Sequence, residues 1–328
     1  MADEIRRNPG REIKSVVIPA YRCETTIAGV IDHIPEWIDH VIVVDDSSPD
    51  STSSIVKEVM KRDDRVHLIQ HSRNQGVGGA VLSGYREAVN LGSDIVIKMD
   101  SDDQMDPACL TQLIKPIQRR EADYTKGNRF LRKGEIRTMP SLRRVGNLGL
   151  SFLTKLASGY WNIFDASNGY TAISTEVIRL LDPAEIDKRY FFETSMLIEL
   201  GICGAVVRDI YIPVRYGAGT SSLSEWRTLV EFPPKLLRGL VRRVIMRYYM
   251  HDFTAVALFL TSGMALTLFG LIWGIAEWIR FSSLGVAAPT GTIMIAVLPL
   301  ILGVQLLLQA IVMDIQNVPK EVLQRQDD

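Results

Sequence analysis

The sequence predicts an α/β domain with a mostly parallel sheet, followed by a C-terminal hairpin of two membrane-spanning helices. Short runs rich in β-branched residues alternate with segments of helical periodicity over residues 14–128. This alternation is typical of a parallel sheet covered by helices. Beyond residue 250 charged residues become rare, and two apolar runs are each long enough to cross a bilayer as a helix.

The expected strands are short, apolar and bounded by turn residues. They are 14–20, 40–44, 66–70, 94–99, 124–128 and 205–213. Apolar residues recur at helical spacing in the segments between them, at 25–34, 51–60, 78–90, 108–120 and 143–157. In open parallel sheets, ligands bind at the carboxyl ends of the strands. Acidic clusters follow two of the strands, so we expect the functional site at that edge of the sheet.

The C-terminal part divides into an amphipathic, basic helix and two apolar runs. We expect a catalytic domain at 1–228, a juxtamembrane helix at 229–250, and two spans at about 255–278 and 291–313 within the segment 251–328. The alternative is a pair of core helices in a soluble protein, which rarely has two such runs in succession.

Flanking charges predict the orientation of the spans. The start of the chain is polar and has no apolar signal-peptide core. Basic residues precede the first span and follow the second, whereas the link between them offers only Glu277 and Arg280. By the positive-inside rule, the domain and both termini face the cytoplasm, at a bacterial inner membrane or its equivalent.

Overall composition excludes some classes of protein. The 37 Lys and Arg residues balance 38 Asp and Glu, so the basic excess of a nucleic-acid-binding protein is absent. The three cysteines have no CxxC spacing and the five histidines no metal-ligand spacing.

Asp100 and Asp102 form the strongest candidate metal site. They stand two residues apart just after an expected buried strand, and Gln104 adds an amide oxygen. Oxygen ligands of this kind suit Mg²⁺ or Mn²⁺ and leave coordination positions for phosphate oxygens. The alternative is an ordinary acidic loop.

Several segments together resemble glycosyltransferase family 2. Residues 97–107 (IKMDSDDQMDP) resemble its DAD-x-Q-x-x-P signature, and 17–21 (VIPAY) its first-strand motif. Residues 43–52 (VVDDSSPDST) and 74–84 (NQGVGGAVLSG) are similar to its DD-x-S-x-D-x-T and N-x-G-x-G-x-A motifs. Gly127–Arg129 matches its G-x-R element and 165–170 (DASNGY) its D-x-x-x-G segment. The resemblance covers about 14–225 and is greatest to the branch that acts on polyprenyl phosphates.

The resemblance implies a GT-A fold and an inverting transfer from a UDP- or GDP-sugar to a polyprenyl phosphate. It implies Mg²⁺ or Mn²⁺ held by Asp100, Asp102 and Gln104, and catalytic roles for Asp102, Arg129 and Glu193. The donor nucleotide-sugar is expected to contact Pro19, Tyr21, Glu24, Asp46, Gly76, Asp100 and Ser101. Members of the branch often assemble through their membrane helices, so a homo-oligomer is a further expectation.

The chain departs from the family pattern at two donor positions. Arg22 and Cys23 intervene before Glu24, and Val77 stands where the glycine loop often carries Lys or Leu. The Q-x-x-R-W element of the polymerising synthases is not found, so we do not expect a polymerising enzyme.

Arginines are the expected acceptor ligands, because a lipid phosphate is already anionic and needs charge balance rather than a base. Arg129 matches the G-x-R position, and Arg143 with Asn147 resembles the second phosphate-binding pair. Arg144 competes for that role, and a solvated basic helix face is the alternative. Arg242, Arg243 and Arg247 either adhere to the membrane or bind the lipid phosphate.

Glu193 stands where other family members carry a catalytic base. With a phosphate acceptor it would instead orient the sugar or an arginine. If the acceptor were a glycolipid hydroxyl, Glu193 would be the base. A more remote alternative is an inactive relative that binds a lipid or a partner.

Overall fold

The structure is a computed structural model that describes residues 11–129, 141–165, 168–213 and 225–325, with the backbone alone at 141–148, 225–230 and 325. It divides into two compact units, one comprising 1–240 with 319–328 and the other 241–318. Each unit is described separately below.

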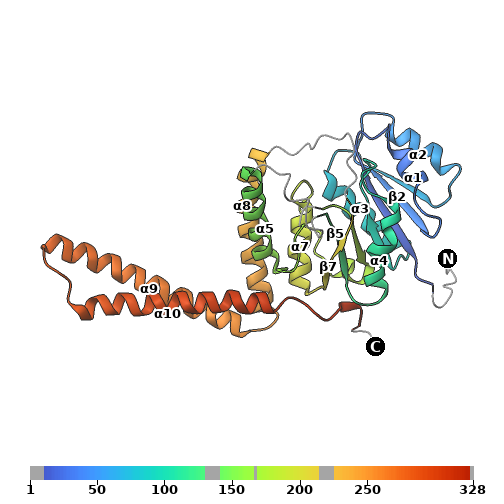
Figure 1. The fold of residues 1–328 in the computed structure, drawn as a ribbon. Coiled ribbons are helices and arrows are strands. Elements are labelled where there is room, and N and C mark those ends of the chain that lie inside the picture. Colours follow the sequence, from blue (N-terminus) through green and yellow to red (C-terminus); the bar gives the residue numbers. More distant parts are fainter. Residues whose placement is uncertain (1–10, 130–140, 166–167, 214–224, 326–328) are drawn as a thin grey trace. The chain divides into compact units, whose positions relative to one another are not determined.

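The first unit is built on a mixed sheet of seven strands in its described part (Figure 1). The order is β3-β2-β1-β4-β6-β5-β7. The strands are β1 (Lys14–Ala20), β2 (His40–Asp45), β3 (Val66–Gln70), β4 (Ile95–Lys98), β5 (Tyr124–Asn128), β6 (Thr171–Ser174) and β7 (Val207–Tyr211). All pairs are parallel except those of β6, which runs antiparallel to β4 and β5. The predicted mostly parallel α/β fold is confirmed.

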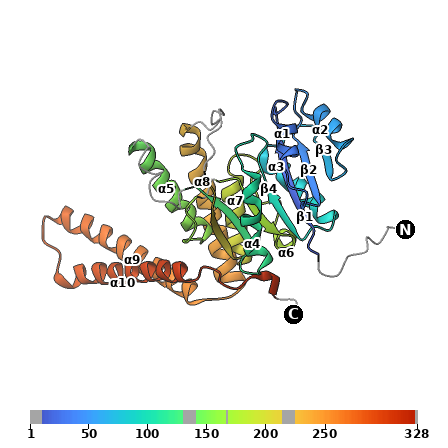
Figure 2. The same ribbon diagram turned by 45° about the vertical axis from the view of Figure 1, so that its right-hand side comes forward.

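Helices cover both faces of this sheet. They are α1 (Ile27–Asp32), α2 (Thr52–Met60), α3 (Val77–Asn90), α4 (Leu110–Gln118), α5 (Ser141–Ser158), α6 (Thr175–Leu180) and α7 (Phe192–Cys203). Figure 2 shows α1 and α2 beside β2 and β3 at one end of the sheet. Val16 and Ile18 of β1 pack with α1 and α4. Val17, on the opposite face, lies against Gly84 of α3.

Strand β6 and helices α6 and α7 were not predicted. Strand β6 has only four residues, two of which carry hydroxyl groups. Helix α7 is buried on nearly all sides, so apolar residues occur along its whole length rather than on one face. A helix without a polar face lacks the periodicity by which an amphipathic helix is recognised.

The second unit is a helical hairpin preceded by the end of a long helix. Helix α8 (Glu225–Ile245) leads through a π-helical turn (Met246–Met250) to α9 (Ala255–Leu284) and α10 (Thr290–Gln316). Both α9 and α10 are long and apolar enough to cross a membrane, and only 22% and 11% of their most apolar windows are buried. A core helix of a soluble protein would be mostly buried, so α9 and α10 are candidate membrane spans.

Small residues bring α9 and α10 close together. A Cβ atom at Gly263 would lie 2.9 Å from the carbonyl oxygen of Gly303, and one at Gly270 2.8 Å from that of Ala296. Glycine therefore permits backbone contact between the two helices, a packing common between membrane helices.

The C-terminal tail belongs to the first unit. The backbone N–H of Leu323 donates to both carboxylate oxygens of Asp123, at 3.0 and 3.1 Å. The same carboxylate accepts the N–H of Val206 at 2.8 Å. Val322 packs with Ala122 and Val206. The chain thus leaves the first unit after residue 240 and returns to it at residue 319.

Candidate active site

Asp46, which directly follows β2, organises the glycine-rich loop that leads into α3. Its carboxylate accepts the backbone N–H groups of Gln75 and Gly76, at 2.8 and 2.7 Å, and lies 2.8 Å from Nδ1 of His71. His71 also contacts the Ser83 hydroxyl at 2.9 Å. Asp46, predicted to contact the donor, therefore holds the loop that opens α3.

Gly76 cannot be replaced without moving the chain. It has a φ of +89°, which L side chains rarely adopt, and a Cβ atom there would collide with the carbonyl oxygen of Lys188. The N–H of Gly78 donates to that same oxygen at 2.9 Å. The glycine loop thus anchors the segment that leads into α7, whose first turn carries Glu193.

The other predicted donor residues gather at the end of β1. Pro19 is buried and pairs with Val44 of β2. Tyr21 is 45% exposed, with the Arg22 guanidinium 5.3 Å from its ring centroid. A carboxylate oxygen of Glu24 accepts the N–H of Ser51 at 2.9 Å. An exposed aromatic ring at this edge offers a stacking surface to a base.

The acidic loop after β4 is held in place from two sides. The Thr26 hydroxyl donates to the carbonyl oxygen of Ser101 at 2.6 Å, and the N–H of Gln104 donates to Asp102 at 3.1 Å. Lys98, the last residue of β4, places its Nζ 2.6 Å from Oδ1 of Asp100. Asp100 is therefore paired with an internal cation, whereas the Asp102 carboxylate accepts only a backbone hydrogen bond among the interactions described for it.

The chemistry of this loop fits a divalent cation. Desolvation raises the pKa of the Asp102 carboxyl, the N–H of Gln104 opposes this, and the negative charge of Asp100 raises it further. A bound cation would relieve that repulsion. Among the described residues, no three His, Cys, Asp or Glu side chains converge on one point. Asp102, Asp100 and Gln104 would therefore need oxygen ligands from outside this loop to complete a coordination shell.

Glu193 joins the same cluster from α7. Its Oε1 lies 3.6 Å from Nζ of Lys98, and its side chain is 17% exposed. Gly169, just before β6, lies over these groups, since a Cβ atom there would collide with Nζ of Lys98 and approach Oδ2 of Asp100 to 2.9 Å. We call Lys98, Asp100, Gly169 and Glu193 the lysine cluster. This close approach leaves no room for a Cβ atom, which explains why the D-x-x-x-G segment has a glycine at this position.

A second buried lysine lies nearby. Lys126 of β5 donates from Nζ to the backbone carbonyl oxygen of Asn168. Burial lowers the pKa of Lys126 to about 8, with Glu193 and Asp165 opposing the shift. Neither Lys98 nor Lys126 was predicted as a site residue. The available signal was a lysine inside a strand whose neighbours are all apolar or small.

Arg129 lies just beyond β5 and is fixed by Asp165. Its Nε and Nη2 donate to the two carboxylate oxygens at 2.9 and 3.1 Å. The Asp165 side chain is 2% exposed and that of Arg129 41%. This bidentate pairing sets the plane of the guanidinium while leaving part of it exposed. Asp165 and Asn168, both in the D-x-x-x-G segment, each contact a basic residue of the chain.

The remaining predicted arginines differ in what the structure describes. Arg143 and Asn147 lie on α5, and their side chains fall outside the described residues. Arg243 is buried in the second unit, where its guanidinium donates to both carboxylate oxygens of Asp314, at 2.8 and 3.1 Å. Neither role considered for Arg243, membrane adhesion or phosphate binding, is compatible with that burial.

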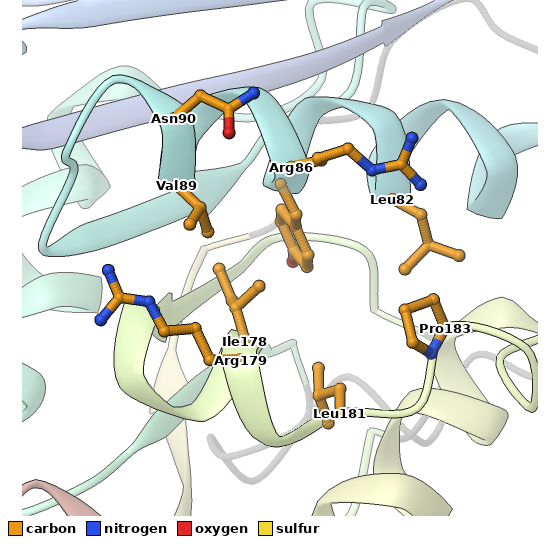
Figure 3. Close-up of a pocket in the computed structure, with 9 residues that line it drawn as sticks. Leu82, Arg86, Val89, Asn90, Ile178, Arg179, Leu181 and Pro183 are labelled. Carbon is orange, nitrogen blue, oxygen red and sulfur yellow. The ribbon is translucent and has the colours of Figure 1, made fainter.

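A separate cleft of about 200 Å³ lies between α3 and the segment around α6 (Figure 3). Leu82, Val89, Ile178 and Leu181 line it, with Arg86 and Arg179 alongside. None of the predicted site residues belongs to its lining, so it is distinct from the strand-end site.

Comparisons with known proteins place the chain in a family. A family model described as glycosyl transferase family 2 matches residues 15–181. The chain is 33% identical over 224 residues to the UDP-N-acetylglucosamine–dolichyl-phosphate N-acetylglucosaminyltransferase of Methanococcus voltae, covering 63% of this chain and 89% of that protein. It is 28% identical over 205 residues to the undecaprenyl-phosphate mannosyltransferase of Micrococcus luteus, covering 61% and 82%.

Solved structures share the fold. A glucosyl-3-phosphoglycerate synthase from Mycobacterium tuberculosis, in complex with Mn²⁺, UDP-glucose and phosphoglyceric acid, is 21% identical, with a TM-score of 0.51 over 71% of this chain and 79% of that one. A mannosyl-3-phosphoglycerate synthase from Rubrobacter xylanophilus is 18% identical, with a TM-score of 0.51 over 74% and 77%. The sheet and its acidic strand ends thus define a GT-A-like fold. The chain belongs to glycosyl transferase family 2.

Proposed function

We propose that the chain transfers a sugar, with inversion, from a nucleotide-sugar to a polyprenyl phosphate at the surface of a membrane. The observation that carries this proposal is the similarity to relatives named for transfer to dolichyl or undecaprenyl phosphate. With the first of these, the shared region spans 89% of the relative. The candidate spans α9 and α10 fit an acceptor that resides in a bilayer.

The donor half of the site is the edge formed by β1, β2 and β4. Tyr21 would stack on the base, and the glycine loop held by Asp46 would lie against the nucleotide. Pro19, Glu24, Gly76, Asp100 and Ser101 complete the donor contacts that we propose. Asp102, Asp100 and Gln104 would hold Mg²⁺ or Mn²⁺, which when bound neutralises charge on the departing nucleoside diphosphate.

The acceptor half relies on Arg129. A phosphate monoester carries its negative charge at neutral pH, so it attacks without first losing a proton to a base. Arg129, whose plane Asp165 fixes, would hold that phosphate and aim its oxygen at the anomeric carbon. Arg143 and Asn147 on α5 remain proposed ligands of the same phosphate.

The path of the chain supports one orientation. Residues 1–240 and 319–328 form one compact unit, so the segments that enter α9 and leave α10 both join the same domain. We therefore propose that the domain and both termini lie on one side of the membrane. The basic residues that flank the spans favour the cytoplasmic side.

The alternative acceptor, a glycolipid hydroxyl with Glu193 as base, has less support. Glu193 lies 3.6 Å from the Lys98 ammonium and is part of an ion-paired cluster. A hydroxyl acceptor would need a carboxylate positioned to take its proton.

The test is sugar transfer by the full chain in lipid nanodiscs containing undecaprenyl phosphate. Radiolabelled UDP-N-acetylglucosamine, UDP-glucose and GDP-mannose are supplied in turn, with Mg²⁺, Mn²⁺ or a chelator. We expect metal-dependent label in the organic phase, released by mild acid as expected of a sugar phosphate. Asp102→Asn should lower the rate about a thousandfold. Asp103→Asn, one residue along the exposed loop, is the matched control and should transfer at the wild-type rate.

Two outcomes would count against the proposal. Acid-stable label in a lipid, lost in Glu193→Gln, would indicate a hydroxyl acceptor and a catalytic base. No lipid label from any donor, with nucleotide-sugar binding intact by calorimetry, would favour an inactive relative.

A further inference from the structure

Lys98 is a buried cation that none of the recognised motifs uses. It is the last residue of β4, and its side chain is 1% exposed. All four residues of β4 are buried, so the strand has no solvent-facing side on which a lysine would ordinarily lie. A buried ammonium is costly unless charged partners compensate for the lost hydration.

The partners of Lys98 come from two separate parts of the chain. Asp100 belongs to the loop that follows β4, and Glu193 to the first turn of α7. Asp100 is 32% exposed and Glu193 17%, so both carboxylates reach toward solvent while the ammonium between them does not. Gly169 closes the cluster on a further side.

The other charged or ionisable groups near the cluster do not replace Lys98. The Tyr85 hydroxyl interacts with Lys98 electrostatically, but it is not a cation. Lys126 donates its Nζ to the carbonyl oxygen of Asn168. Lys98 is therefore the cation in contact with both Asp100 and Glu193 in the described part of the chain.

We propose that Lys98 is a positioning residue that fixes the donor-side carboxylate Asp100 relative to Glu193 of α7. The inference rests on the proposed function, because that function assigns Asp100 to the donor contacts and, with Asp102 and Gln104, to the metal. Without the ammonium, two like charges would face each other and separate. The loop that carries Asp102 would move with Asp100, and the reacting groups would lose their alignment.

Loss of the Lys98 ammonium should affect catalysis and cation binding in opposite directions. The Lys98 ammonium neutralises Asp100, so it opposes a second cation at the acidic loop. Removing it should strengthen the binding of Mn²⁺ while it weakens catalysis. A variant that merely unfolds the site would weaken both, so the two measurements together separate positioning from damage.

The experiment compares Lys98→Met with wild type, using the full chain. The dissociation constant for Mn²⁺ alone is measured by electron paramagnetic resonance, and kcat and KM by sugar transfer. We expect the dissociation constant to fall about fivefold, as removal of one unit charge a few ångströms away predicts. We expect kcat to fall about a hundredfold, with the donor KM changed less than about threefold. Lys14→Met, a partly buried lysine that contacts Glu12 at the start of β1, is the matched control and should change neither.

A double variant tests the link to Glu193. If Lys98 acts by holding that carboxylate, Lys98→Met with Glu193→Gln should be no slower than Lys98→Met alone. Independent roles would multiply the two losses. Should Lys98→Met fail to fold, Gly169→Ala disturbs the same cluster with every charge kept. It should lower kcat without strengthening the binding of Mn²⁺, because no charge is removed.

The outcomes separate this inference from the proposed function. Wild-type transfer with Lys98→Met unchanged in kcat, or weaker in Mn²⁺ binding, would overturn the role of Lys98 and keep the proposed function. So would multiplied losses in the double variant, or an unchanged kcat in Gly169→Ala. Tighter Mn²⁺ binding in Lys98→Met, with no transfer by wild type to any polyprenyl phosphate, would support the electrostatic link and overturn the proposed function.

Discussion

Two buried cations, one in each unit of the molecule, are paired in different ways. Arg243 in the second unit, which contains the helical hairpin, donates two hydrogen bonds to one carboxylate, that of Asp314. The Tyr248 hydroxyl donates to the same carboxylate. Both side chains of the ion pair are at most 8% exposed. Lys98 in the first unit instead contacts two carboxylates, those of Asp100 and Glu193, which remain partly exposed to solvent.

The difference indicates what each cation does. The charges of Arg243 and Asp314 compensate each other and both side chains are buried, so this closed pair connects α8 to α10 rather than binding a ligand. An open cluster with two carboxylates around one ammonium carries a net negative charge at its exposed side. Such a cluster suits a site that must receive a substrate and a cation.

Breaking the closed pair should have the largest effect on stability. Arg243→Met removes the cation that compensates the buried Asp314 carboxylate, so we expect the free energy of unfolding to fall by about 3–5 kcal/mol. Denaturation of the full chain in detergent measures this, and the activity of the remaining folded fraction should be unchanged. Arg243→Met combined with Asp314→Leu should recover most of the loss.

Arg247→Met provides the control for that experiment. Arg247 lies one turn further along, is only partly buried, and donates to the carbonyl oxygen of Asn317 through a solvent-exposed hydrogen bond. Its loss should cost under about 1 kcal/mol. Equal stability of Arg243→Met and wild type would show that the ion pair of Arg243 with Asp314 does not stabilise the fold.

Arg129 and Asp165 form an intermediate case, with one partner buried and the other half exposed. Arg129→Lys keeps the charge and loses the planar fork, so we expect kcat/KM for the lipid phosphate to fall about a hundredfold. Asp165→Asn should cost about tenfold, because it only orients the arginine. Initial rates at varied acceptor concentration measure both effects.

The control for this pair is Arg208→Lys. Arg208 forms an exposed ion pair with Glu121, with side chains 49% and 41% exposed. Its kcat/KM should equal that of wild type. A wild-type acceptor KM in Arg129→Lys would remove Arg129 from the acceptor site.

Lys126 should produce a pH dependence of stability rather than a loss of activity. Its pKa is lowered by burial to about 8 from an ordinary value of 10.5. Between these values the unfolded chain binds more protons than the folded one, so stability rises with pH. The free energy of unfolding of wild type, relative to Lys126→Met, should increase by about 1.4 kcal/mol per pH unit from pH 8 to 10. A constant difference would mean that Lys126 titrates normally.

The elements near the strand ends could be predicted because their signals are local. A buried strand followed by Asp45 and Asp46, or by Asp100 and Asp102, is readable from alternation and turn residues alone. The mostly parallel α/β sheet and the two candidate spans followed from such local signals, whereas the GT-A fold followed from the resemblance to the family. All three are confirmed. The roles assigned to the site residues stay proposals.

The lysine cluster could not be predicted, because its members come together only through tertiary structure. Lys98 and Glu193 are 95 residues apart in the sequence, and the contact depends on α7, which has no amphipathic pattern. Strand β4 is covered on both faces, so alternation gives no rule for where a lysine may point. The pairing of Arg243 with Asp314 was hidden for a similar reason, since basic residues before a span suggest a lipid surface.

The return of the tail to Asp123 has a consequence for biosynthesis. The ribosome makes residues 319–325 only after α9 and α10, so the buried Asp123 carboxylate receives the N–H of Leu323 last. The catalytic unit therefore cannot be completed before the hairpin has been translated. A nascent chain stalled before residue 319 would carry an unfinished domain, and its maturation would wait for synthesis of the two candidate spans that precede the tail.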